Sequence, residues 1–154
     1  MTTHAIPEGF RGATPYLCVA GAAAAIEFYG RAFGAVETLR LAEPGGRIGH
    51  AELRIGDAPI MLSDEYPEMG VRSPASLGGS PLTIHLYVAD VDALFARATA
   101  AGATVAREVA DQFYGDRTCT LLDPFGHRWM FATHREDVSP AEMERRYRGF
   151  FAER

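Results

Sequence analysis

The sequence predicts an α+β fold in which two tandem βαβββ modules form a curved mixed sheet that closes into a cup. The order strand, helix, strand, strand, strand occurs twice, with an offset of about 69 residues between the copies. The strands of each copy alternate between apolar and polar residues, as expected for a sheet with one face packed on a helix. The matching segments are Thr14–Val19 with Thr83–Val88, Ala32–Ala35 with Ala100–Ala103, and Ile60–Leu62 with Trp129–Phe131.

The first module is predicted over about residues 14–64. Its helix spans Ala22–Phe33, where Ile26, Tyr29 and Phe33 fall on one helical face. Gly34 follows at the position where a left-handed residue usually ends a helix. The strands of this module are predicted at 14–19, 36–41, 48–55 and 58–63.

A segment rich in Pro, Gly and Ser, at about 65–81, follows the first module, and its length indicates either a linker or a lid over the cup. The second module is predicted over about 82–133. Its helix begins after Asp90 or Asp92, either of which can cap it, and ends at Gly102. Its strands are predicted at 82–88, 104–109, 118–122 and 127–132. Ser139–Glu142 forms a capping box with proline at the first helical position, which predicts a C-terminal helix at about 140–151.

Length and charge limit the possible classes of function. A chain of 154 residues suffices for one domain with a real core and is short for two. The net charge of −5, without a basic face, argues against nucleic acid or an anionic membrane as a partner. Cys18 and Cys119 predict free thiols in a reducing compartment. Without an apolar leader or long apolar run, the sequence predicts a cytoplasmic protein.

The polar residues of the alternating strands are expected to converge inside the cup, where His, Glu, Arg and Tyr side chains indicate a ligand site. The candidate ligand-binding residues are Tyr16, His50, Glu52, His85, Tyr87 and Arg117. The same face is expected to carry Thr14, Cys18, Arg54, Ser63, Thr83, Arg128 and Met130. By contrast, His127 and His134 are expected to be solvated, because they lie at a turn and after a strand end.

Several motifs resemble those of the vicinal oxygen chelate superfamily of glyoxalases, bleomycin-resistance proteins and extradiol dioxygenases. Tyr16–Val19, Ala25–Tyr29 and Phe33–Ala35 resemble the opening of glyoxalase-like modules, and Leu122–His127 resembles the turn before their final strand. The similarity covers about residues 14–133 and implies one glyoxalase-like domain over 1–154. The N-terminal lead-in and the C-terminal helix resemble extensions of the PhnB-like branch. The resemblance also implies a homodimer.

In the enzymes of this superfamily, His, Glu or Gln side chains from the first and last strands of each module hold a metal. The matching positions here are Thr14, Met61, Thr83 and Met130. Thioethers are soft ligands that suit divalent Fe, Mn, Ni or Zn poorly, and threonine is neutral. The resemblance therefore implies that the usual metal site is lost, and no cofactor is predicted. The alternative is a divalent metal at a displaced site formed by His50, Glu52 and His85.

These observations leave three hypotheses. The first is a protein that binds a small organic molecule in a polar-aromatic cup, as bleomycin-resistance proteins do. The second is an enzyme of lyase or isomerase type, with His50, Glu52 or His85 as acid/base groups or displaced metal ligands. The third is an assembly or regulatory module that dimerises through the C-terminal helix. The first two are favoured over the third.

Overall fold

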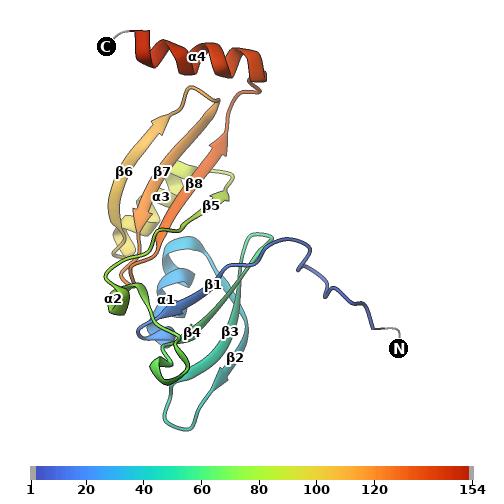
Figure 1. Cartoon of the computed structure of the whole chain (residues 1–154), viewed down its shortest axis with the longest axis vertical. Coiled ribbons are helices and arrows are strands. Elements are labelled where there is room, and N and C mark those ends of the chain that lie inside the picture. Colours follow the sequence, from blue (N-terminus) through green and yellow to red (C-terminus); the bar gives the residue numbers. More distant parts are fainter. Residues whose placement is uncertain (1–2, 153–154) are drawn as a thin grey trace.

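The computed structural model describes residues 3–152, and it contains two modules with the same order of elements (Figure 1). The first module consists of β1 (Tyr16–Val19), α1 (Ala22–Phe33), β2 (Val36–Ala42), β3 (Ile48–Ile55) and β4 (Ala58–Asp64). The second consists of β5 (Thr83–Tyr87), α3 (Val91–Ala101), β6 (Thr104–Asp111), β7 (Asp116–Leu122) and β8 (Arg128–His134). The prediction of a tandem βαβββ fold is confirmed, as is the C-terminal helix α4 (Pro140–Ala152).

Each module carries its own four-stranded mixed sheet, with strand orders β1–β4–β3–β2 and β5–β8–β7–β6. The first strand of each module pairs in parallel with the last, whereas all other pairs are antiparallel. The register preserves the sequence repeat, because Tyr16 pairs with Met61 in the first sheet and His85 pairs with Met130 in the second.

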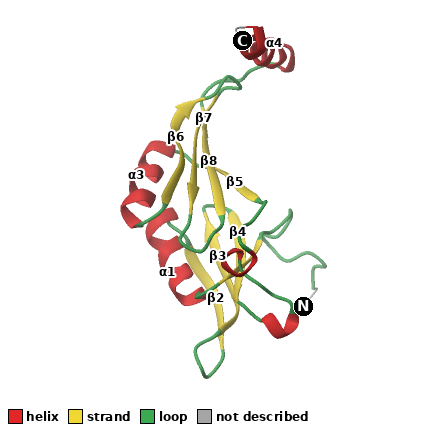
Figure 2. Ribbon diagram, turned by 60° about the vertical axis from the view of Figure 1, so that its left-hand side comes forward, coloured by secondary structure: helices red, strands yellow, loops and turns green. Residues whose placement is uncertain are grey.

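Helices α1 and α3 lie side by side and cover the same side of both sheets (Figure 2). The buried apolar residues of both modules form one continuous cluster. The ring of Phe33, at the end of α1, lies 4.8 Å from Phe131 and 5.0 Å from Trp129 of the other module (centroid to centroid). Each such buried side chain contributes about 1.5–3 kcal/mol, so the two modules stabilise one another through a shared core.

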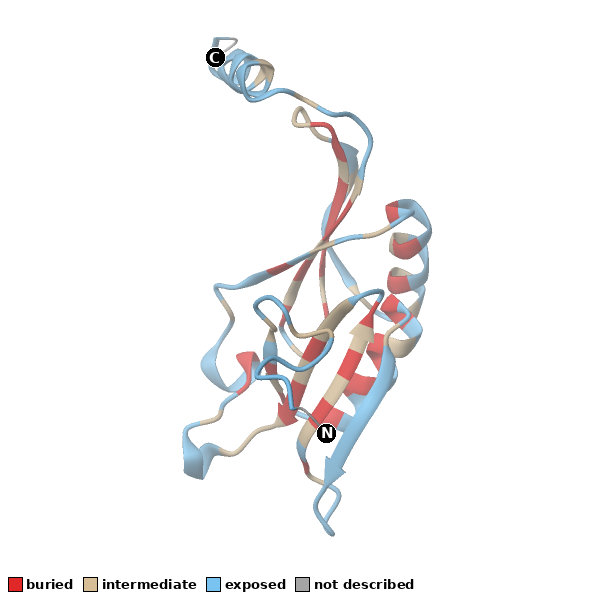
Figure 3. Ribbon diagram, turned by 90° about the vertical axis from the view of Figure 1, so that its right-hand side faces the viewer, coloured by how far each residue is buried: buried red, intermediate tan, exposed pale blue. Residues whose placement is uncertain are grey.

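The predicted alternation places the polar residues on the side of each sheet away from the helices. In β3, Leu53 and Ile55 are buried while Glu52 and Arg54 are half-buried on the opposite face. In β5, Ile84 is buried whereas the residues on either side of it are exposed. The outer strand β2 is exposed along its whole length (Figure 3).

The connection between the modules contains a 3₁₀ turn (η1, Pro67–Met69) and a short helix (α2, Pro74–Leu77). The Arg47 guanidinium lies 3.9 Å from the ring centroid of Tyr66, whose hydroxyl donates to Glu43 at 2.8 Å. These contacts hold the start of the connection against the β2–β3 hairpin. At its other end, Pro74 lies so close to Gly126 (φ +92°) that a Cβ there would approach within 2.8 Å of Pro74 Cβ.

Helix α4 lies beyond the far end of the second sheet and covers neither sheet face (Figure 1). It contacts the tip of the β6–β7 hairpin, where Phe113 lies 5.7 Å from Tyr147 and 5.3 Å from Phe150 (centroid to centroid). Ser139 Oγ accepts from the backbone N–H of Glu142 at 3.2 Å, which confirms the predicted N-cap. Among the described residues, no helix is both long and apolar enough to cross a membrane.

A buried carboxylate joins the two modules. Asp123, in the turn before β8, accepts from the Tyr29 hydroxyl at 2.6 Å and from the Trp129 indole at 2.9 Å. Its other oxygen accepts from the backbone N–H groups of Phe125 and His127, each at 2.9 Å. Since Tyr29 belongs to α1, this carboxylate ties the helix of the first module to the last turn of the second.

We expect Asp123→Ala to lower the free energy of unfolding by about 3 kcal/mol or more, because it leaves four donors without their acceptor. Tyr29→Phe, which removes one of those donors, should cost about 1 kcal/mol. Urea denaturation measures both changes. Asp111→Ala, at an exposed position of β6, is the control and should change stability by about 0.5 kcal/mol or less. A loss below about 1 kcal/mol for Asp123→Ala would contradict the assigned role.

Candidate functional site

Three of the predicted ligand-binding residues form a chain on the polar face of the first sheet. The hydroxyl of Tyr16, on β1, lies 2.7 Å from Nδ1 of His50, on β3. Nε2 of the same ring lies 3.2 Å from Oε1 of Glu52, two residues further along β3. His50 and Glu52 meet because residues i and i+2 of a strand share a face. The sequence prediction that these side chains share one surface is therefore confirmed.

The chain has a defined direction of hydrogen bonding when the imidazole is neutral. A carboxylate only accepts, so Nε2 of His50 carries the hydrogen and Nδ1 accepts from the Tyr16 hydroxyl. Partial burial, together with the charge of Glu52, raises the pKa of Tyr16 above its ordinary value. Tyr16 therefore keeps its proton at neutral pH and presents it to His50.

Apolar side chains from the neighbouring strands flank this chain. Leu41 is the register partner of His50, and Leu39 is the register partner of Glu52. Both leucines are exposed, on the outer strand β2. Met61 of β4 pairs with Glu52 on its other side. This face therefore places hydrogen-bonding groups next to apolar side chains.

A second polar group lies on the corresponding face of the second sheet. The Tyr87 hydroxyl donates to Oδ2 of Asp116 at 2.7 Å, and Nδ1 of His134 lies 2.7 Å from Oδ1 of the same carboxylate. Nε2 of His134 lies 2.8 Å from Asp137. The His85 ring lies 5.1 Å from the Tyr87 ring (centroid to centroid). Of these residues, only His85 and Tyr87 were predicted to bind a ligand.

The second group contains strongly coupled charges. Burial opposes ionisation of Asp116, but the hydrogen bonds from Tyr87 and His134 outweigh it and hold the pKa of that carboxyl below its ordinary value. Asp137 and then Asp116 raise the pKa of His134. The hydrogen bond to Asp116 raises the pKa of Tyr87. The group therefore favours a protonated imidazole between two carboxylates, with a neutral phenol beside them.

The prediction that Arg117 belongs to the polar face is wrong. Its register partner on β8 is Thr133, whose hydroxyl accepts from the first backbone N–H of α3, so Arg117 lies on the helix-covered side of β7. There its guanidinium binds Asp92 in two hydrogen bonds of 2.8 and 2.9 Å, and Asp111 at 3.1 Å. The alternation of buried Cys119 and Leu121 was the sequence signal for this placement.

The prediction that His127 and His134 are solvated is wrong for His127 and confirmed for His134. His127 is buried, with Nε2 2.9 Å from the backbone oxygen of Cys18, and so connects the last turn of the second module to β1. His134 is exposed, and its ring lies between two carboxylates. Asp64, at the end of β4, accepts from the backbone N–H groups of Gly21 and Ala22 at the start of α1.

The residues at the metal positions of the superfamily do not fit a divalent metal. Thr14, Met61, Thr83 and Met130 offer no carboxylate or imidazole. The three residues of the displaced alternative are divided between the sheets, since His50 and Glu52 lie on β3 and His85 on β5. Within residues 3–152, no three His, Cys, Asp or Glu side chains gather in a way that could hold a metal ion.

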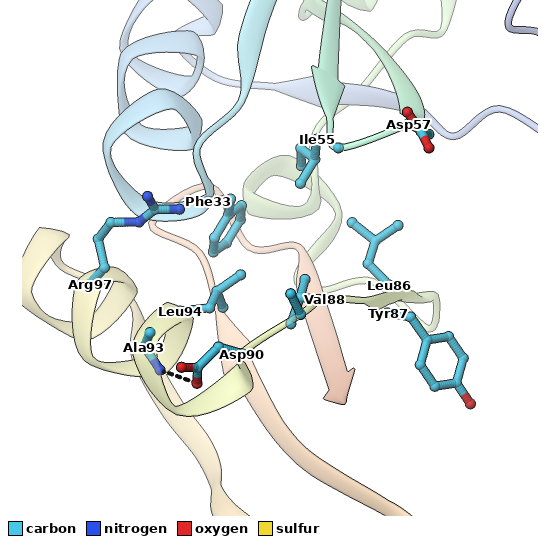
Figure 4. Close-up of a pocket in the computed structure, with 12 residues that line it drawn as sticks. Phe33, Ile55, Asp57, Leu86, Tyr87, Val88, Asp90, Ala93, Leu94 and Arg97 are labelled. Carbon is cyan, nitrogen blue, oxygen red and sulfur yellow. Dashed lines mark hydrogen bonds between the residues drawn. The ribbon is translucent and has the colours of Figure 1, made fainter. Parts of the chain in front are cut away.

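A separate hollow of about 560 Å³ lies where the modules meet, on the side of the helices (Figure 4). Its apolar lining includes Phe33 and Ile55 of the first module and Leu94 of the second. Tyr87 is at its edge, but its ring points away from these apolar side chains (Figure 4). This hollow is therefore distinct from the polar faces, which lie on the other side of the sheets.

Comparisons with known proteins agree with this architecture. An uncharacterized protein of Mycobacterium bovis is 48% identical over 134 residues, which cover 85% of this chain and 88% of that protein. The crystal structure of TioX from Micromonospora sp. ML1 is 30% identical, with a TM-score of 0.64, and the match covers 80% of this chain and 99% of that one. The structure of an Arabidopsis thaliana gene product is 29% identical, with a TM-score of 0.64 and coverages of 80% and 98%.

A family model gives the broader relationship. The model of the Glyoxalase/Bleomycin resistance protein/Dioxygenase superfamily matches residues 12–131, which span both modules and every residue of the Tyr16–His50–Glu52 chain. Solved structures with lower identity share the fold, among them a family member from Burkholderia phytofirmans PsJN at 22% identity and a TM-score of 0.63. The chain thus belongs to the glyoxalase/bleomycin resistance protein/dioxygenase superfamily.

Proposed function

We propose that the protein binds a small organic molecule against the polar faces of its sheets, without the usual metal site of the superfamily. The observation that carries this proposal is the hydrogen-bonded Tyr16–His50–Glu52 chain, which lies beside the exposed leucines of β2 on a face that the helices leave uncovered. Such a surface offers a phenol, an imidazole and a carboxylate to the polar groups of a ligand, and apolar walls to its body. The residues at the positions where the superfamily binds its metal have no carboxylate or imidazole, which favours ligand binding over metal-dependent catalysis.

A second copy of the chain is proposed to complete the cup. The two polar groups of one chain lie on different sheets, and no hydrogen bond between described residues joins them. Two pairs of exposed apolar residues lie at opposite ends of the molecule, with Leu39 and Leu41 on β2 at one end and Phe150 and Phe151 on α4 at the other (Figure 1). In a two-fold dimer, the β2 end of each chain would pack against the α4 end of the other, so the apolar residues at both ends of both chains would be covered.

Two finer assignments belong to the same proposal. The lead-in and α4 support placement in the PhnB-like branch of the superfamily. The two free cysteines, Cys18 and Cys119, support a reducing compartment such as the cytoplasm.

A second candidate function is acid/base catalysis. The favouring observation is again the Tyr16–His50–Glu52 chain, in which a carboxylate orients an imidazole and the imidazole accepts from a phenol. An oriented histidine of this kind is a competent general base next to a carbonyl group. Because the pKa of Tyr16 is raised, its hydroxyl stays protonated at neutral pH and donates a hydrogen bond to His50.

Ligand binding can be tested with ¹H–¹⁵N correlation NMR, in which planar aromatic cations and neutral aromatic compounds are added one at a time. A bound compound should shift the amide signals of β1 and β3 around Tyr16, His50 and Glu52. We expect His50→Ala to weaken binding by about tenfold, which corresponds to the loss of one charge-assisted hydrogen bond. Arg40→Gln, on the other face of β2, is the matched control and should bind like the wild type. No shift with any compound, or shifts scattered over the surface, would contradict the proposal.

Acid/base catalysis can be tested by deuterium exchange. In D₂O, the wild-type protein should speed the exchange of hydrogens next to the carbonyl of hydroxyacetone. His50→Gln should reduce the rate by about 100-fold, the lower range for a general base, and Tyr16→Phe should have a smaller effect. An exchange rate that is equal for the wild type and His50→Gln would exclude this second function while leaving the binding proposal intact.

The dimer can be tested by size-exclusion chromatography with light scattering. We expect a mass twice the 16.7 kDa of the chain. Leu41→Lys should shift the protein to the monomer, because it places a charge in the apolar contact. Arg40→Glu, the adjacent residue on the other face of β2, should leave the mass unchanged. A monomeric wild type would overturn the dimer, and equal effects of the two variants would place the interface elsewhere.

A further inference from the structure

We propose that a second site, the hollow between the end of β8 and the start of α4, binds a small organic cation. This hollow has a volume of about 510 Å³, within the range of small-molecule sites. Its lining includes Tyr87, Tyr114, Asp116, His134, Asp137 and Met143. It shares only Tyr87 with the predicted ligand-binding residues and lies on the opposite module from the Tyr16–His50–Glu52 chain.

The charges around the hollow favour a positive ligand. Both ring nitrogens of His134 face carboxylates, Nδ1 toward Asp116 at 2.7 Å and Nε2 toward Asp137 at 2.8 Å. A doubly protonated imidazole between two carboxylates leaves one net negative charge. Asp116 is nearly buried, at 4% exposure, so water screens its charge less than that of a surface carboxylate. The exposed Asp137 is available for direct contact with a ligand.

The arginines near the hollow form ion pairs with carboxylates outside it. Arg135 points toward Asp92, at 4.0 Å. Arg146 binds Glu136 and Glu142, each at 2.8 Å. The partial positive charge at the N-terminus of α4 is offset by Ser139, which caps it, and by Glu142 in its first turn. Besides His134, the imidazole of His85 also lowers the pKa of Asp116.

The aromatic lining supplies the second element of cation recognition. The phenol rings of Tyr87 and Tyr114 and the thioether of Met143 line the same hollow as the carboxylates. The faces of phenol rings attract ammonium groups, and aromatic side chains recognise quaternary ammonium ligands in this way. The Tyr87 ring is held in place by its hydrogen bond to Asp116 and is 63% exposed, so its face is accessible.

A purely structural role does not account for all of the side chains around this hollow. The segment after β8 is already fastened without His134, because the backbone N–H groups of Arg135 and Glu136 both donate to the oxygen of Gly115, at 2.9 and 3.0 Å. The carboxylate of Asp137 and the ring of Tyr114 are not needed for that attachment. Ligand binding explains why these two side chains line the same hollow as a buried carboxylate.

Choline and its uncharged isostere 3,3-dimethylbutan-1-ol are the probes for this site. In ¹H–¹⁵N correlation NMR, choline should shift the amide signals of Tyr114, Val138 and Ser139, and the isostere should bind about tenfold more weakly. Tyr114→Leu and Asp137→Asn should each weaken choline binding by about fivefold or more. Asp111→Asn removes the same charge from an exposed position of β6 and should bind choline like the wild type.

The pH dependence gives an independent readout. Above the raised pKa of His134, the site loses its positive charge, so choline should bind more tightly as the pH rises through that value; His134→Gln should remove this dependence. Equal binding of the isostere, an equal loss in Asp111→Asn, or no choline shift at all would overturn the proposal. Tyr16→Phe should leave choline binding unchanged, which separates this site from the ligand site on the first sheet.

Discussion

The carboxylate of Asp123 is the point at which the two halves of this protein become one structure. It is buried, and four donors from α1, the turn before β8 and β8 itself converge on it. Around it, the rings of Tyr29, Phe33 and Trp129 pack within 6 Å of one another (centroid to centroid). A buried ion is costly unless its hydrogen bonds are complete, so this turn tolerates only the arrangement in which α1 lies against the second module. The common orientation of the two sheets follows from that docking.

This docking leaves the polar faces of both sheets uncovered on the same side of the molecule. Both faces carry a tyrosine, a histidine and a carboxylate, but their order differs. In the first sheet the histidine His50 is central, whereas in the second sheet the carboxylate Asp116 is central. The first arrangement holds an imidazole between an exposed phenol and a carboxylate. The second gives a fixed anionic centre, so the two copies of one module offer different chemistry.

Sequence alone predicted the parts of this structure that depend on local patterns. The repeat, the boundaries of α1 and the alternation in β3 and β5 all follow from residue spacing, and so does the meeting of His50 with Glu52. Contacts between distant residues were not predictable in this way. Nothing near His127 in the chain indicates that it binds the backbone of Cys18, and nothing near Asp116 indicates Tyr87. Arg117 is a different case, because the buried register of Cys119 and Leu121 did contain the information.

The position of the single tryptophan has a practical consequence. Trp129 is fully buried, stacks between aromatic rings of both modules and donates its indole hydrogen to Asp123. Its fluorescence therefore reports whether α1 is docked on the second module and is insensitive to events on the polar faces, which lie on the other side of the sheet. A change in tryptophan emission when a compound is added would signal a rearrangement between modules. Binding of a compound to either polar face alone would leave the emission unchanged.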